Sequence, residues 1–283
     1  FLSSNHSYLL YFTDMGRVYR TKTYNIPEAG RTAKGTPVVN IIEKSPEQKI
    51  SEIIPVKEFS DNEYLVMVTK NGIIKKTPAS EYESIRKSGK IAITLKEGDE
   101  LISIFKTTGN DNIFLATRNG MAICFNENDA RAVGRTASGV KAIDLADGDY
   151  VVGAEPVRED SKVLLVTDGG YGKCTDLTSF RIQHRGGKGL KAYKITEKTG
   201  NIIGISMVND SEELIMVTSE GVVIRIRIKD IATTTGRITQ GVRLINLDDG
   251  VTVVSMDKIS AEDAVEEESE ENNTEVTTET TEE

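Results

Sequence analysis

Five short segments of the chain combine glycine and other small residues with arginine or lysine. They occupy residues 30–35, 85–89, 134–139, 185–189 and 236–241, and an arginine lies near the start of each. Small residues let the main chain approach a ligand closely, exposed N–H groups donate to phosphate oxygens, and a neighbouring cation balances the negative charge. These residue types indicate binding of a phosphate backbone.

The most basic stretch, residues 181–194, contains five Arg or Lys residues and no carboxylate. One copy alone would also fit a tight crossover in which glycines supply positive φ and the cations are merely solvated. Recurrence at a nearly constant offset in five units favours phosphate binding. The predicted DNA-binding residues are Gln183, His184, Arg185, Gly186, Gly187, Lys188, Gly189, Lys191, Arg31, Lys34, Arg86, Lys87, Arg135 and Arg237.

The basic segments belong to a longer repeat. Five times an apolar run ends in threonine, followed by two residues and a glycine, and these turn glycines lie 56, 48, 50 and 51 residues apart. Turns such as Asn71-Gly72 are strong hairpin signals, because both residues tolerate positive φ. A second glycine follows each turn glycine by 17 to 20 residues, and we expect a further apolar strand after it, as at residues 37–42, 91–95 and 242–247.

Four short strands per repeat, with no amphipathic helix longer than two turns, predict an all-β fold of radially repeated blades, a propeller or a close relative of one. Alternation of isoleucine with arginine at residues 224–228 is typical of a strand with one buried face and excludes a helical solenoid. The predicted domain spans residues 1–258, with repeat units at about 1–50, 51–100, 101–149, 150–199 and 200–258.

The net charge of −9 is concentrated at one end of the chain. Residues 261–283 hold 11 of the 44 acidic residues and no basic ones, which leaves residues 1–260 with 35 basic against 33 acidic residues, a balance of +2. The Glu- and Thr-rich end is too weakly apolar to offset its ordering entropy, so we predict a disordered acidic tail over residues 259–283. Such a tail is either a solubilising extension or a DNA mimic that competes for the basic segments.

The remaining composition limits the class of protein. No run of eighteen apolar residues occurs, and the only cysteines, Cys124 and Cys174, occupy matching repeat positions. We therefore expect a soluble cytoplasmic chain without a disulfide framework. His6 and His184 have no partners at metal-ligand spacing, and no Gly-Lys-Ser/Thr phosphate loop occurs, so we expect no metal and no cofactor in this chain. Because the chain begins at Phe1 without an initiator Met, we expect it to be part of a longer protein.

Residues 183–189, Gln-His-Arg-Gly-Gly-Lys-Gly, resemble the gyrase A box, which is a glutamine, two arginines, two glycines, a basic residue and a glycine. The segments at 30–35 and 134–139 are similar to the degenerate copies in other blades. On these residues the chain, from residue 1 to about 258, resembles the C-terminal DNA-wrapping domain of the bacterial DNA gyrase A protein, a component of a type IIA topoisomerase. The resemblance implies a β-pinwheel whose four-stranded blades exchange strands, five in this chain and six in the full domain, with duplex DNA bent around its rim.

The chain departs from the family pattern in two ways. His184 stands where the box has its second-position arginine, so the permanent cation of the family pattern is absent there. The family's principal box belongs to the first blade, whereas this copy lies in the fourth unit, so by order we expect the first blade upstream of Phe1. Residues 183–189 are then either the principal DNA anchor or a secondary contact.

The resemblance also implies a parent enzyme that introduces negative supercoils in an ATP-dependent reaction. Its partners are duplex DNA and, in a nucleoid-associated heterotetramer, the N-terminal region of the gyrase A protein and the gyrase B protein. The strand-cleaving tyrosine, ATP and Mg²⁺ belong to other parts of that holoenzyme, so we expect no catalytic residue in this chain. Two alternatives remain: the corresponding C-terminal domain of topoisomerase IV, which has fewer blades and more eroded boxes, and a protein-binding propeller with aromatic, non-basic rim loops.

Overall fold

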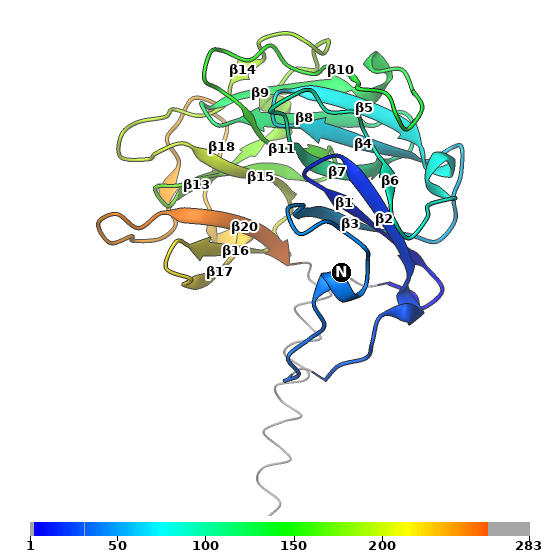
Figure 1. Cartoon of the computed structure of the whole chain (residues 1–283). Helices are drawn as coiled ribbons and strands as arrows, with labels where there is room; N and C mark the ends of the chain where they lie inside the picture. The colour runs from blue at the N-terminus through cyan, green and yellow to red at the C-terminus, as the bar shows by residue number, and fades with distance from the viewer. Residues whose placement is uncertain (1–2, 31, 260–283) are drawn as a thin grey trace, which may run out of the picture. The chain divides into compact units, whose positions relative to one another are not determined.

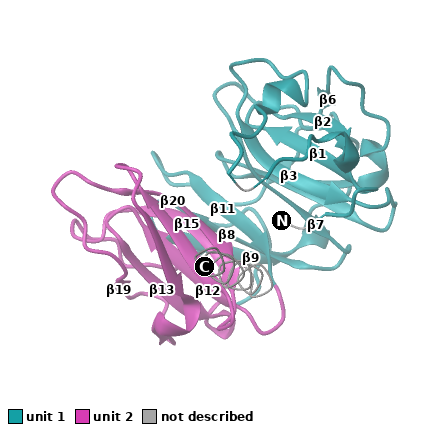
Figure 2. Ribbon diagram, turned by 90° about the horizontal axis from the view of Figure 1, so that it is seen from below, with its two compact units in different colours: residues 1–157, 181–190 teal, residues 158–180, 191–283 magenta. Residues whose placement is uncertain are grey.

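The computed structural model describes residues 3–30 and 32–259, and the chain divides into two compact units. Unit 1 comprises residues 1–157 and 181–190, and unit 2 comprises residues 158–180 and 191–283, coloured teal and magenta in Figure 2. Apart from Ile259, the predicted acidic tail at 259–283 lies outside the described residues. No described helix has the length and hydropathy needed to span a membrane.

Each repeat begins with a β-hairpin whose turn is held by its threonine. In all five turns the threonine Oγ1 accepts a hydrogen bond at 3.1–3.2 Å from the N–H four residues later. The turn glycines have φ between 72° and 86°, where a side chain would be strained. The Thr-x-x-Gly pattern is therefore a hydrogen-bonded turn. The hairpins are β1 (Tyr8–Thr13) with β2 (Arg17–Lys22), β4 (Tyr64–Thr69) with β5 (Ile73–Pro78), β8 (Asn112–Thr117) with β9 (Met121–Asn126), β12 (Lys162–Thr167) with β13 (Tyr171–Asp176), and β16 (Glu213–Thr218) with β17 (Val223–Arg227).

A third strand pairs antiparallel with the first strand of each hairpin. It follows the hairpin in the sequence and precedes the next hairpin, and from here on we count a repeat from its hairpin to the end of this strand. A β-bulge interrupts every one of these pairs next to the hairpin threonine, which increases the local twist. The third strands are β3 (Ile50–Val56), β7 (Leu101–Thr107), β11 (Val151–Pro156), β15 (Ile202–Val208) and β20 (Val253–Ile259).

The outermost strand of a sheet comes from the following repeat. In unit 1, β6 pairs with β2, β10 pairs with β5, and β14 lies next to β9 (Figure 1). In unit 2, β18 and β19 both pair with β13, and the sheet of β16, β17 and β20 has three strands among the residues described. This is the strand exchange expected of a pinwheel. The exchanged strands are β6 (Lys90–Ile91), β10 (Val140–Lys141), β14 (Leu190–Lys191), β18 (Thr233–Thr234) and β19 (Val242–Arg243).

The strands expected at residues 37–42, 91–95 and 242–247 need correction. The last two are only two residues long as β6 and β19, and residues 37–42 form a 3-10 turn instead of a strand. An exchanged strand forms only on the hairpin of a preceding repeat, and residues 37–42 have no preceding hairpin in the described part of the chain. Ile42 instead packs against Leu9, Tyr11 and Tyr19 of its own repeat. The 3-10 turns are η1 (Thr23–Asn25), η2 (Val38–Asn40), η3 (Ala79–Tyr82), η4 (Glu127–Asp129), η5 (Leu177–Ser179) and η6 (Ile228–Asp230).

The hydrophobic core lies between successive sheets, so the central hairpin strands are buried on both faces. In β4, Leu65 and Met67 pack in one cluster with Phe12 of β1, whereas Val66 and Val68 pack in another with residues of β8. Residues of β12 and β16 share a cluster in the same way within unit 2. A strand buried on both faces has an unbroken apolar run instead of an alternating one. The chain is thus an all-β, five-bladed propeller of small sheets, with three blades in unit 1 and two in unit 2.

The first prediction concerns this packing. Met67 of β4 is 0% exposed and lies in one cluster with Phe12 of β1. Met67→Ala should therefore lower the free energy of unfolding by about 2–5 kcal/mol, through lost burial and a residual cavity. Met15, at a hairpin turn, is 56% exposed, and Met15→Ala is the matched control with little expected effect. Urea unfolding followed by circular dichroism measures both. Equal stability of the two variants would contradict the burial of β4 on this face.

Candidate nucleic-acid interface

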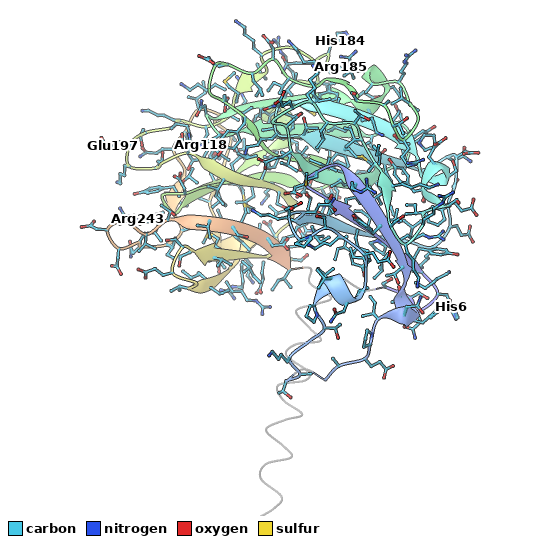
Figure 3. The ribbon with its side chains drawn as sticks, viewed as in Figure 1. His6, Arg118, His184, Arg185, Glu197 and Arg243 are labelled. Carbon is cyan, nitrogen blue, oxygen red and sulfur yellow. The ribbon has the colours of Figure 1, made fainter. Side chains whose placement is uncertain are left out.

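From the second repeat onward, the basic segment lies between the second hairpin strand of its repeat and the exchanged strand, which places the segment across the hairpin of the preceding repeat. In unit 1 the Val133 N–H donates to Lys76 O at 2.9 Å, and the Gln183 N–H donates to Cys124 O at 2.8 Å. Figure 3 shows His184 and Arg185 on one such segment, in the loops at the outer edge of the sheets. These main-chain bonds thus fix the position of the segments at 134–139 and 185–189 on the preceding repeat.

Two glycines at the ends of these segments allow the main chains to come this close. Gly139 and Gly189 have φ of 85° and 74°. A Cβ added at Gly139 would lie 2.5 Å from Ile74 O, and one added at Gly189 would lie 2.4 Å from Ala122 O. Glycine is required at both positions, by its backbone conformation and by the approach of the neighbouring strand.

Neighbouring segments also bond to one another. Thr94 Oγ1, which follows the segment at 85–89, donates to Thr136 O at 2.7 Å. The Asp144 N–H, which follows the segment at 134–139, donates to Gly187 O at 2.9 Å. The residues that follow the second and third segments are therefore bonded to the next segment, and we call this succession of three segments in unit 1 the path.

Two of these arginines, Arg135 and Arg185, attach their segments to the preceding repeat. Arg185 Nε donates to Asp129 O at 2.8 Å, and its Nη1 donates to Lys141 O at 3.0 Å. Arg135 Nη1 donates to Ile91 O at 2.7 Å, the same position one repeat earlier. Both arginines are half-buried, so each has a positioning role in addition to the charge that it brings.

The other predicted site residues differ in accessibility. His184 is 98% exposed, with Nδ1 3.2 Å from Asp129 Oδ2, whereas Gln183 is half-buried, and its Nε2 has no hydrogen-bond partner among the described residues. Arg237 is half-buried in unit 2, and Arg31 lies outside the described residues. The remaining predicted cations are exposed: Lys34, Arg86, Lys87, Lys188 and Lys191.

The structure adds charged residues that the sequence did not indicate. Lys141 Nζ lies 2.7 Å from Asp144 Oδ1, and Asp129 contacts two residues of the box. The hydrogen bond and charge of Lys141, and more weakly the charge of Lys188, lower the pKa of Asp144. Asp144 is therefore an anion at neutral pH, and its ion pair with Lys141 partly neutralises that cation. No pattern in the sequence indicates that Asp129 belongs to the site, because it lies 55 and 56 residues from the box residues that it contacts.

The geometry brings together cations and main-chain N–H groups, which bind anions. No group of three or more His, Cys, Asp or Glu side chains able to hold a metal ion occurs in residues 3–30 and 32–259. Cys124 and Cys174 are buried free thiols, and burial raises the pKa of each to about 11, which keeps them protonated and unreactive.

Known proteins share this architecture. The family model "DNA gyrase C-terminal domain, beta-propeller" matches residues 7–57, 63–108, 111–158, 161–209 and 212–260. The DNA gyrase A protein of Halalkalibacterium halodurans is 54% identical over 263 residues, and that of Clostridium acetobutylicum is 49% identical over 264 residues. Each alignment covers 93% of this chain, which spans about a third (32%) of the length of either relative.

A solved structure of the C-terminal domain of DNA topoisomerase IV superposes with a TM-score of 0.86 at 28% identity. The superposition covers 96% of this chain and 84% of that one. The five matched segments of the family model each contain one hairpin and the third strand that completes it. From the repeated blades and these matches, we conclude that the chain belongs to the family of DNA gyrase C-terminal β-propeller domains.

Proposed function

We propose that this chain binds duplex DNA along its basic segments and bends it, as the wrapping domain of a gyrase A protein. The observation that supports this most is the path of basic segments on successive repeats of unit 1. A duplex that follows consecutive blades must curve, because each blade is rotated relative to the one before it. Phosphates contacted on several blades would offset the bending energy.

Recognition in this proposal is of the DNA backbone and not of base sequence. Among the predicted DNA-binding residues that the structure describes, the exposed cations are four lysines and Arg86, which suit phosphate oxygens. Base reading in the major groove normally uses an inserted helix or a two-stranded ribbon that presents side chains to base edges. The helices among the described residues are 3-10 turns of three or four residues, which are too short for that role. The hairpins of the first four repeats lie inside their sheets with a further strand on each side, so they are not free two-stranded ribbons.

The curated relatives favour gyrase over topoisomerase IV for the parent protein. Two gyrase A proteins are 49% and 54% identical to this chain, whereas the solved C-terminal domains of topoisomerase IV and gyrase A, at 28% and 25% identity, do not separate the two. In the parent, this domain would present bent DNA for ATP-dependent negative supercoiling. It would act there with the N-terminal region of the gyrase A protein and with the gyrase B protein, in a cytoplasmic, nucleoid-associated heterotetramer. ATP, Mg²⁺ and the cleavage chemistry would lie in those other parts.

The second prediction tests DNA binding. Fluorescence anisotropy with short duplexes of unrelated sequence should give similar affinities, and log K should fall steeply and linearly with log salt as counterions are released. The double variant Lys87→Gln with Lys188→Gln removes two exposed cations and should reduce the slope by about 1.8.

The matched control for this experiment is Lys57→Gln with Lys229→Gln, which removes two exposed lysines outside the basic segments. Its slope should equal that of the unmodified chain. An affinity independent of salt would support the protein-binding alternative, and equal slopes for the two double variants would place the duplex elsewhere on the molecule.

The third prediction concerns the carboxylate beside the path. Asp144→Asn removes a negative charge next to Lys188 and releases Lys141 from its ion pair. DNA affinity should rise by about two- to fivefold at low salt, and the gain should vanish at high salt. Asp160→Asn, an equal change of charge at an exposed loop residue outside the segments, is the control. If both substitutions raised the affinity equally, only net charge would matter.

The fourth prediction concerns the acidic end of the chain. Removal of residues 261–283 changes the net charge from −9 to +2 by removing 11 acidic residues. If this segment competes with DNA, the shortened chain should bind DNA more tightly at low salt and equally at high salt, with an unchanged melting temperature. Equal affinities at low salt would leave the segment as a solubilising extension.

A further inference from the structure

Two buried lysines occupy the same position of the repeat. Lys75 and Lys173 are 1% and 0% exposed, and each is the third residue after its turn glycine. The corresponding residues of the other repeats are Tyr19, Ile123 and Ile224. An apolar side chain is therefore compatible with the fold here, and the two ammonium groups need a separate explanation.

The ammonium of Lys75 binds main-chain carbonyls of the basic segment at 134–139. Its Nζ donates to Arg135 O at 2.5 Å and to Gly134 O at 3.4 Å. A third bond, of 2.5 Å, goes to Ala92 O at the end of the preceding exchanged strand. These acceptors lie 17, 59 and 60 residues away in the sequence, so a single side chain fixes the segment to the preceding repeat.

Lys173 repeats this arrangement in unit 2. Its Nζ donates to Arg237 O at 2.5 Å and to Gly236 O at 3.3 Å, the equivalents of the Lys75 contacts. A third bond of 3.1 Å goes to Thr239 Oγ1, and the Tyr193 ring centroid lies 5.3 Å from the ammonium. Two independent copies of one geometry indicate a common role for the lysine.

That role follows from peptide geometry. In a trans peptide the N–H points opposite to the C=O, so carbonyls of residues 134 and 135 that face the ammonium turn the N–H groups of Arg135 and Thr136 away from it. The same holds for Arg237 and Ile238. We propose that Lys75 and Lys173 orient these two pairs of consecutive amides outward as main-chain binding sites for DNA phosphates. Paired amides of this kind, next to a cation, form anion-binding concavities.

The proposed role needs the ammonium form of both lysines, and this form is lost as the pH rises past the pKa of each. Burial lowers the pKa of Lys75 to about 7, with a further lowering by Arg135 and an opposing effect of Glu81, and burial lowers the pKa of Lys173 to about 8. The carbonyl acceptors favour the ammonium form, because only the charged group donates to all of them. A buried cation is costly, so its presence twice at a position where isoleucine also fits favours a positioning role.

The box segment at 185–189 is held differently. Ile123 stands at the lysine position, and the Gly186 N–H donates to Ala142 O at 2.6 Å. The Gly186 amide is thus engaged with the preceding repeat, whereas the Lys188 side chain is exposed. The proposed amide sites therefore belong to the Gly-Arg segments and not to the box.

The test uses the two lysines as controls for each other and rests on the proposed DNA binding. The full chain and its Lys75→Met and Lys173→Met variants, labelled with ¹⁵N, are titrated with a short duplex while amide shifts are recorded. In Lys75→Met, the amides of Arg135 and Thr136 should stop responding to DNA, while those of Arg237 and Ile238 still respond. Lys173→Met should give the reverse, and each variant should bind DNA about tenfold more weakly.

The proposal would be overturned if the amides of Arg135 and Thr136 still responded to DNA in Lys75→Met. It would also be overturned if either variant lost the DNA response of both amide pairs, because that result would indicate general destabilisation. Lys76→Met, which breaks the 3.3 Å pair of a neighbouring buried lysine with Glu127, is a control for stability and should spare both pairs. Hydrogen exchange of the amides, measured without DNA, tests the lysine contacts separately from DNA binding. If the unmodified chain bound no DNA, the proposed function would fail, whereas loop-specific exchange changes would still support the lysine contacts.

Discussion

The exchange of the outermost strand between successive repeats is the constraint on which the rest of the structure depends. Strands of two residues, such as β6 and β10, cannot persist alone and exist only by pairing with the hairpin of the preceding repeat. Because the basic segment directly precedes the exchanged strand, that pairing also sets the position of the segment. The same hydrogen bonds that join two blades therefore place the cations of one repeat beside those of the next.

The repeated elements could be predicted from the sequence, whereas the contacts between repeats could not. The Thr-x-x-Gly turns and the glycines that end the basic segments are local, so their hydrogen bonds and positive φ follow from residue type. Residues 37–42 have the pattern of an exchanged strand but no preceding hairpin among residues 3–30 and 32–259, which is why a local pattern mispredicted them. The carbonyls that accept from Arg185 lie 44 and 56 residues away, beyond any local signal. Lys75 stands within an apolar run, and only the fold shows what its ammonium contacts.

The candidate interface contains two kinds of cation. Exposed lysines such as Lys188 keep their hydration and would exchange counterions for phosphates, which makes their contribution dependent on salt. Arg135, Arg185 and Lys75 bond to main-chain carbonyls, so their contribution is to the shape of the segments. Asp144 opposes the first kind by pairing with Lys141. A near-neutral domain can therefore present a local anion-binding path.

The central claim is that one duplex follows the basic segments of successive repeats. Cross-linking from single cysteines tests it most directly, with Lys87→Cys, Thr136→Cys and Lys188→Cys on three consecutive repeats and Lys57→Cys as an exposed control outside the segments. The native cysteines are buried and should not react. With a duplex bearing photoreactive phosphate groups at known positions, we expect cross-links from residues 87, 136 and 188 in the order of the blades along the DNA, and few from residue 57. Unordered cross-links from the three positions, or equal yield from residue 57, would contradict a duplex that follows these segments.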